Sequence, residues 1–150
     1  MPAKVCFVTG SGRRIGASII RKFAEEGYAV LIHVSTSLEA GESLKSELIE
    51  NGCQADLLQS DLTDEEQTEE LLSIVSNHSF VEERGGLDVL VHNASVYSQI
   101  SVDELSLETM RFLNRLHVEA PLQISQGLFA SLSAVKGLII ALTDLSLIHI

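Results

Sequence analysis

The chain has 150 residues, 45% of them hydrophobic, and a formal net charge of −11 at pH 7. This predicts a single domain with a full core, and the acidic surface argues against binding to nucleic acid or to an anionic membrane. With two cysteines, no secretory signal and no apolar run of membrane-spanning length, we expect a cytoplasmic protein without a disulfide framework.

Short apolar segments alternate with segments of helical periodicity along the chain. The segments predicted as strands are 4–8, 29–33, 55–59, 87–91 and 138–142. A first helix follows the first strand and ends at Gly27, and a second helix ends at Gly52, since glycine commonly terminates helices. Thr63 with Glu66 predicts a capping box at the start of a third helix.

A long helical pattern lies before the last strand. Ser101 with Glu104 offers an N-terminal cap, and Pro121 predicts a kink. Strict alternation of strands and helices predicts an α/β fold, namely a Rossmann-type, doubly wound parallel sheet with five strands present. Ligands of such sheets bind at the carboxyl ends of the strands, so the residues that follow each strand form the candidate site.

The turn after the first strand has the composition of a phosphate-binding loop. Its glycines allow a tight turn and a close approach to a ligand, and the following helix would direct its free N–H groups at a phosphate. The predicted cofactor contacts here are Gly10, Ser11, Gly12, Arg13, Arg14, Ile15 and Gly16. The alternative is an ordinary glycine-rich turn with two solvated arginines.

The spacing Thr9-Gly10-x-x-x-Arg14-x-Gly16 resembles the T-G-x-x-x-G-x-G turn of the short-chain dehydrogenase/reductase family. In having an arginine at the position of the middle glycine, this turn is similar to the turn of pteridine reductases and dihydromonapterin reductases. The resemblance covers residues 3–145 and implies a single, C-terminally truncated dinucleotide-binding domain whose last two family strands are missing. The ending at 145–150 resembles no family continuation, so we expect a truncated reading frame or a foreign junction, with 146–150 as a non-native tail.

Residues after the second and third strands are candidates for the adenosine end of a dinucleotide. NAD-specific sites usually place an acidic residue after the second strand, and this chain has none there, which favours NADPH/NADP with Arg14 nearby. Pteridine reductases are similar here but carry an additional arginine where Thr36 stands. The predicted cofactor contacts are His33, Ser35, Ser37, Asp61 and Leu62. An ordinary polar loop and helix start are the alternatives.

The segment His92-Asn93-Ala94-Ser95 resembles the family motif N-N-A-G in the H-N-A-S form of dihydromonapterin reductases. The resemblance implies that Asn93, Ala94 and Ser95 contact the cofactor and that Ser95 also contacts the substrate. Tyr97 matches the aromatic residue that stacks on the pterin in pteridine reductases, which implies a substrate contact. Its alternative role is to pack a loop.

Two residues are implied as catalytic by the same resemblance. His117 aligns with the helix asparagine of the family's catalytic tetrad, and Asp144 aligns with the catalytic serine, where pteridine-type reductases have aspartate. A core histidine and a plain turn residue are the alternatives. The other histidines show no metal-ligand spacing to cysteine or carboxylate, so no metal site is predicted; they are His33, His78, His92 and His149.

The resemblance implies an NADPH-dependent reductase that transfers hydride to a dihydropterin, a small-molecule substrate. A short-chain carbonyl reductase and a non-catalytic nucleotide-binding fragment are the alternatives. The family's catalytic Tyr-x-x-x-Lys is absent, so we expect the 150-residue chain itself to be inactive. The helical segment 110–132 corresponds to the family's common subunit contact, which implies a homo-oligomer for a full-length version.

Overall fold

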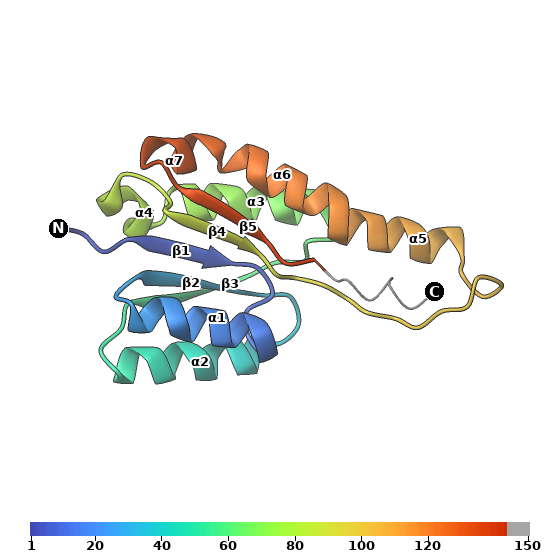
Figure 1. Cartoon of the computed structure of the whole chain (residues 1–150), viewed down its shortest axis with the longest axis horizontal. Helices are drawn as coiled ribbons and strands as arrows, with labels where there is room; N and C mark the ends of the chain where they lie inside the picture. The colour runs from blue at the N-terminus through green and yellow to red at the C-terminus, as the bar shows by residue number, and fades with distance from the viewer. Residues whose placement is uncertain (144–150) are drawn as a thin grey trace.

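The computed structural model describes residues 1–143, which form a five-stranded parallel sheet between two layers of helices (Figure 1). The strands are β1 (Val5–Val8), β2 (Ala29–Val34), β3 (Ala55–Gln59), β4 (Val89–His92) and β5 (Leu138–Ala141). Their order is β3-β2-β1-β4-β5, so the chain builds outward from β1 first to one side and then to the other. This confirms the predicted Rossmann-type, doubly wound α/β fold.

Helices cover both faces of the sheet. On one face lie α1 (Arg14–Glu25) and α2 (Leu38–Glu50). On the other lie α3 (Glu65–Ser76), α4 (Ser79–Arg84), α6 (Ala120–Gly127) and α7 (Phe129–Ala134). Successive residues of β1 alternate between the two cores, since Phe7 packs with the α3 and α6 side and Val8 with the α1 and α2 side. Burial on both faces explains why β1 and residues 29–32 of β2 are uniformly apolar, whereas β3, at one edge of the sheet, also contains Asp56 and Gln59.

The predicted capping box of Thr63 and Glu66 is wrong. Helix α3 is capped one residue later by Asp64, whose carboxylate accepts a hydrogen bond of 3.0 Å from the backbone N–H of Gln67. Thr63 is used differently, because its hydroxyl donates to Asp61 at 2.6 Å. Both residues satisfy cap chemistry, and the fold selects the one whose backbone stands at the helix start.

The cap predicted at Ser101 and Glu104 is also wrong. These two residues close an isolated turn, and α5 (Leu107–Asn114) begins later, where the hydroxyl of Ser106 accepts a hydrogen bond of 3.0 Å from Thr109. Beyond α5 the helix widens into a π-helical turn, η1 (Arg115–Glu119), and then resumes as α6. The proline at 121 cannot donate to the carbonyl four residues earlier, which accounts for the change of pattern where the kink was predicted.

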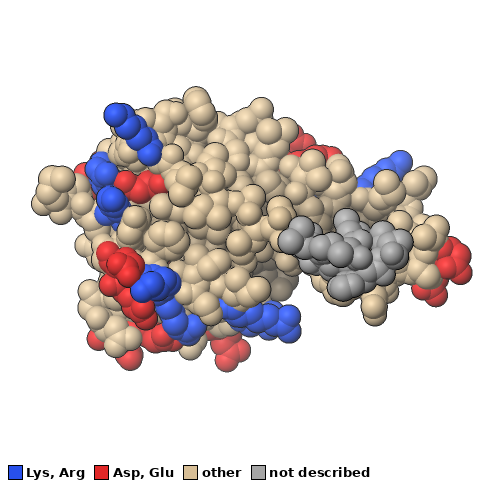
Figure 2. Space-filling model, in the orientation of Figure 1, with Lys and Arg blue, Asp and Glu red and all other residues tan. Residues whose placement is uncertain are grey.

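The last predicted strands are placed with small shifts. The strand predicted at 87–91 begins at Val89, after the short helix α4 that the periodicity did not indicate. In the described residues β5 is an edge strand, and Leu138 and Ile139 keep 57% and 42% of their surface exposed. The face that carries β5 is largely free of charged side chains (Figure 2). Within residues 1–143, no helix is long and apolar enough to cross a membrane.

Candidate functional site

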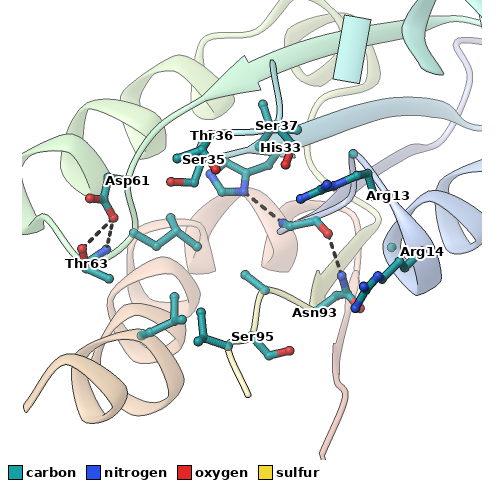
Figure 3. Close-up of a pocket in the computed structure, with 18 of the residues that line it drawn as sticks. Arg13, Arg14, His33, Ser35, Thr36, Ser37, Asp61, Thr63, Asn93 and Ser95 are labelled. Atoms are coloured by element: carbon teal, nitrogen blue, oxygen red, sulfur yellow. Dashed lines mark hydrogen bonds between the residues drawn. The ribbon is translucent and has the colours of Figure 1, made fainter. Parts of the chain in front are cut away.

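A cavity of about 750 Å³ opens at the carboxyl ends of the strands (Figure 3). It is lined by every predicted cofactor contact except Ser11, so residues from four separate strand ends meet there. Sequence reasoning missed part of the wall, because apolar helix positions such as Phe112 and Leu116 have the spacing of core residues. The lining residues that were not predicted are Val34, Thr36, Thr63, Val96, Phe112 and Leu116.

Two glycines of the turn between β1 and α1 are required by its geometry. Gly10 has a φ of +60°, in the left-handed region that glycine adopts without strain. A Cβ atom on Gly16 would lie 2.5 Å from the carbonyl oxygen of Gly10, so the first turn of α1 rests directly on the loop. Ser11 is fully buried beneath them and donates from its hydroxyl to the carbonyl of Val8 at 2.8 Å. It supports the turn from inside the protein.

The start of α1 is suited to bind an anion. Among the described residues no side chain caps this helix, and its first turn contains no acidic residue. Its free N–H groups and positive dipole end therefore face the cavity, with Arg13 and Arg14 beside them. Arg14 has a φ of +53°, an uncommon value for a residue other than glycine. This is the position of the middle glycine in T-G-x-x-x-G-x-G, so the backbone conformation suited to glycine is present with a cationic side chain attached.

The two arginines point to different parts of the cavity. Arg13 lies beside Ser37 at the end of β2, whereas Arg14 lies beside Asn93 at the end of β4 (Figure 3). A second hollow of about 550 Å³, at the start of α2, is lined by Arg13, Thr36 and Ser37 but not by Arg14. The exposed Glu39 of α2 lines it as well. Arg13 is therefore the arginine that is placed to bind a charged group over the β2–α2 loop.

His33 forms part of the cavity wall but keeps only 1% of its surface exposed. Its Nδ1 accepts a hydrogen bond of 3.0 Å from the N–H of Gly10, and its Nε2 lies 3.1 Å from both the carbonyl and the hydroxyl oxygen of Ser60. Burial lowers the pKa of His33 to about 4, although the hydrogen bond to Ser60 opposes that shift. The ring is therefore neutral near pH 7.

A second network joins the ends of β1 and β4. The buried hydroxyl of Thr9 accepts hydrogen bonds from the backbone N–H groups of Asn93 at 3.0 Å and Ala94 at 3.1 Å. The side-chain amide of Asn93 donates to the carbonyls of Thr9 at 3.1 Å and Gly10 at 2.9 Å. These bonds hold the H-N-A-S segment against the glycine-rich turn, and Ala94 and Ser95 line the cavity beside it.

Asp61 lies at the far end of the cavity, with one carboxylate oxygen held in place. Its Oδ1 accepts from the N–H of Thr63 at 2.9 Å and from the hydroxyl of the same residue at 2.6 Å. Within the described part of the chain, the second oxygen has no hydrogen-bond donor. Leu62 beside it is buried and presents an apolar wall. Asp61 can therefore accept a hydrogen bond from an amino group, and Leu62 can cover one face of a flat ring.

Of the residues predicted to act in catalysis or to contact the substrate, only some lie at the cavity. His117 is exposed, and its Nε2 accepts a hydrogen bond of 3.2 Å from the N–H of Val96. Tyr97 is 74% exposed and does not line the cavity, whereas Ser95 does. Asp144 lies outside the described residues. Residues 1–143 contain no cluster of three or more histidine, cysteine, aspartate or glutamate side chains that could bind a metal ion.

Known proteins resemble this chain in sequence and in fold. The sequence model of a family described as short chain dehydrogenase matches residues 4–145. An uncharacterized oxidoreductase from Thermotoga maritima is 36% identical over 121 residues, which are 81% of this chain and 45% of that protein. The chain thus spans less than half the length of that relative.

Two solved structures with bound NADP have the same fold. One is the FolM alternative dihydrofolate reductase 1 from Brucella canis, with a TM-score of 0.82, 27% identity, and coverage of 94% of this chain and 55% of that one. The other is a metagenomic short-chain oxidoreductase, with a TM-score of 0.84, 26% identity, and coverage of 95% of this chain and 63% of that one.

Proposed function

Because the chain belongs to the short-chain dehydrogenase family, we propose that it forms the NADPH-binding part of an oxidoreductase. The observation that carries this proposal is the start of α1, which no side chain of residues 1–143 caps. Arg13 at this helix start also lies beside the β2–α2 loop, which has no acidic residue at 35–37. NADP is bound in similar solved structures, which supports the same choice of nucleotide. When bound, the nicotinamide would supply the hydride.

The residues of the cavity divide naturally among the parts of such a nucleotide. The N–H groups at the start of α1 would bind the diphosphate, and Asp61 with Leu62 would hold the adenine. Arg13, Thr36 and Ser37 would bind the ribose 2′-phosphate, since all three line the second hollow. The segment at 93–95 would line the reacting end. The 2′-phosphate role, expected from the sequence for Arg14, is thereby proposed for Arg13.

Arg13→Ala should weaken NADPH binding by about 10- to 100-fold while changing NADH binding little, because a charge-assisted hydrogen bond contributes roughly 1.5–3 kcal/mol. Fluorescence titration of both nucleotides against the wild type and the variant measures this. Equal affinity of the wild type for NADPH and NADH would contradict the proposal.

Two matched variants sharpen the assignment. Arg14→Ala should weaken both nucleotides alike, since Arg14 lies away from the second hollow. Glu39→Gln should strengthen NADPH binding selectively, since it removes a carboxylate that lines that hollow. If Arg14→Ala instead removes the preference for NADPH, the 2′-phosphate belongs to Arg14, as the sequence alone suggested.

For the substrate, we propose a dihydropterin. Support comes from the similar dihydrofolate reductase structure and from the H-N-A-S segment, whose Ser95 lines the cavity. A carbonyl substrate is the alternative, and it is favoured by the outward position of Tyr97, which leaves no aromatic ring at the cavity wall in that loop. In a longer protein that contains this segment, Tyr97→Ala should raise the KM for a dihydropterin and leave carbonyl reduction unchanged.

The 150-residue chain by itself should bind NADPH without measurable turnover. It contains no Tyr-x-x-x-Lys, and loss of general acid–base catalysis typically costs about 10²- to 10⁴-fold in rate. Oxidation of NADPH in the presence of a dihydropterin or a reactive ketone, followed by absorbance, tests this. Turnover by the chain alone would show that another group, such as His117, supplies the proton.

A further inference from the structure

The ring of His33 joins three strand ends that are distant in sequence. It belongs to β2, accepts a hydrogen bond from the N–H of Gly10 after β1 through Nδ1, and meets Ser60 after β3 through Nε2. The backbone of His33 adds two more bonds, because its carbonyl accepts from the N–H of Ser11 at 2.8 Å and its N–H donates to the Ser11 hydroxyl at 3.0 Å. In residues 1–143, hydrogen bonds from the glycine-rich turn to β2 are thus made with His33, and Val34 packs against Gly12.

These contacts determine the tautomer of the ring. The N–H of Gly10 can only donate, so Nδ1 must carry no proton, and the carbonyl of Ser60 can only accept, so Nε2 must carry one. Either a shifted proton or a second proton on the ring would break the bond to Gly10. The very low exposure of the ring leaves no water to replace it.

We propose that His33 is a positioning residue for the adenosine half of the bound dinucleotide. It sets the Gly10 turn relative to the ends of β2 and β3, and this inference rests on the proposed NADPH site. The diphosphate would lie at the turn, the ribose at Ser35 and Ser37, and the adenine at Asp61, immediately after Ser60. One ring therefore fixes the distance between three parts of the binding surface, although it would make no polar contact with the nucleotide itself.

Two substitutions separate the two ring contacts. The side-chain oxygen of asparagine lies about where Nδ1 lies, so His33→Asn keeps an acceptor for Gly10 and loses the donor to Ser60. The side-chain nitrogen of glutamine lies about where Nε2 lies, so His33→Gln keeps the donor to Ser60 and loses the acceptor for Gly10. Each variant loses one buried hydrogen bond, so their melting temperatures should fall by similar amounts.

The two variants of His33 should differ in their affinity for NADPH, although their stabilities should be similar. We expect His33→Asn to bind NADPH nearly as tightly as the wild type, and His33→Gln to bind about three- to tenfold more weakly, the equivalent of one lost hydrogen bond. Equal affinities of the two variants would overturn the proposal, as would losses that follow the melting temperatures alone.

Measurements without nucleotide separate failure of this inference from failure of the proposed function. The amide of Gly10 should exchange slowly with solvent in the wild type and in His33→Asn, and quickly in His33→Gln. In the wild type, ¹⁵N NMR should show Nδ1 without a proton, and a protonated Nδ1 would overturn the inference even if neither variant folds. If the exchange pattern holds but the wild type does not bind NADPH, the proposed function is wrong and the role of His33 in shaping the turn remains.

Discussion

Thr9→Val should lower the free energy of unfolding by about 2–4 kcal/mol, because it leaves the N–H groups of Asn93 and Ala94 without their acceptor. Valine has nearly the shape of threonine, so the loss would come from the missing hydroxyl and not from a cavity. The expected cost is large because one oxygen serves two donors at a site that is 2% exposed. Urea unfolding followed by circular dichroism measures the change.

Thr9→Ser is the matched control. It keeps the hydroxyl and removes one methyl group, so it should cost only about 1 kcal/mol. If the valine and serine variants are equally stable, the hydroxyl does not hold β4 to β1 and the network described for Asn93 contributes little. Because the same bonds hold the segment at 93–95 beside the cavity, Thr9→Val should also weaken NADPH binding more than Thr9→Ser does.

Acidification from pH 6.5 towards pH 4 should destabilise the protein. The pKa of His33 is about 4 in the folded protein, and its ordinary value is 6.5. Between these values the unfolded chain binds a proton that the folded chain does not, so stability is complete above pH 6.5 and falls as the pH approaches 4. A shift of this size corresponds to about 3 kcal/mol. Burial also lowers the pKa of His92, so this residue adds a further loss of stability as the pH falls.

Urea unfolding at a series of pH values between 6.5 and 4 tests this prediction, with His33→Asn as the control. The variant lacks the titrating ring, so its stability should be lower at neutral pH but should vary less over the same range. An unchanged pH dependence in the variant would assign the acid sensitivity to other groups. Asp56 is not one of them. Burial raises its pKa, but hydrogen bonds from Lys45 and His78 outweigh this and lower it to about 2, so Asp56 acts only under stronger acid.

Strands β1, β2 and β4 could be predicted from the sequence because nearly all of their residues are buried between helices on both faces of the sheet, which leaves short apolar runs such as 29–32. Helix ends were predicted where glycine is required, since Gly27 and Gly52 both have positive φ values. Helix starts were not. Thr63 and Asp64 both have cap chemistry, and the choice between them depends on where the chain leaves the sheet.

The candidate site shows the same division. The amino-acid sequence by itself determined that glycines and two arginines follow the first strand and that the H-N-A-S motif follows the fourth, because these positions depend only on the order of residues along the chain. Only the tertiary structure separated Arg13 from Arg14, since adjacent residues at a helix start point in different directions. Only the tertiary structure also showed that His33 makes hydrogen bonds with Gly10 and Ser60, which lie 23 and 27 positions away in the sequence. Hydrogen bonds across such distances depend on the order of the strands in the sheet, and no local pattern records that order.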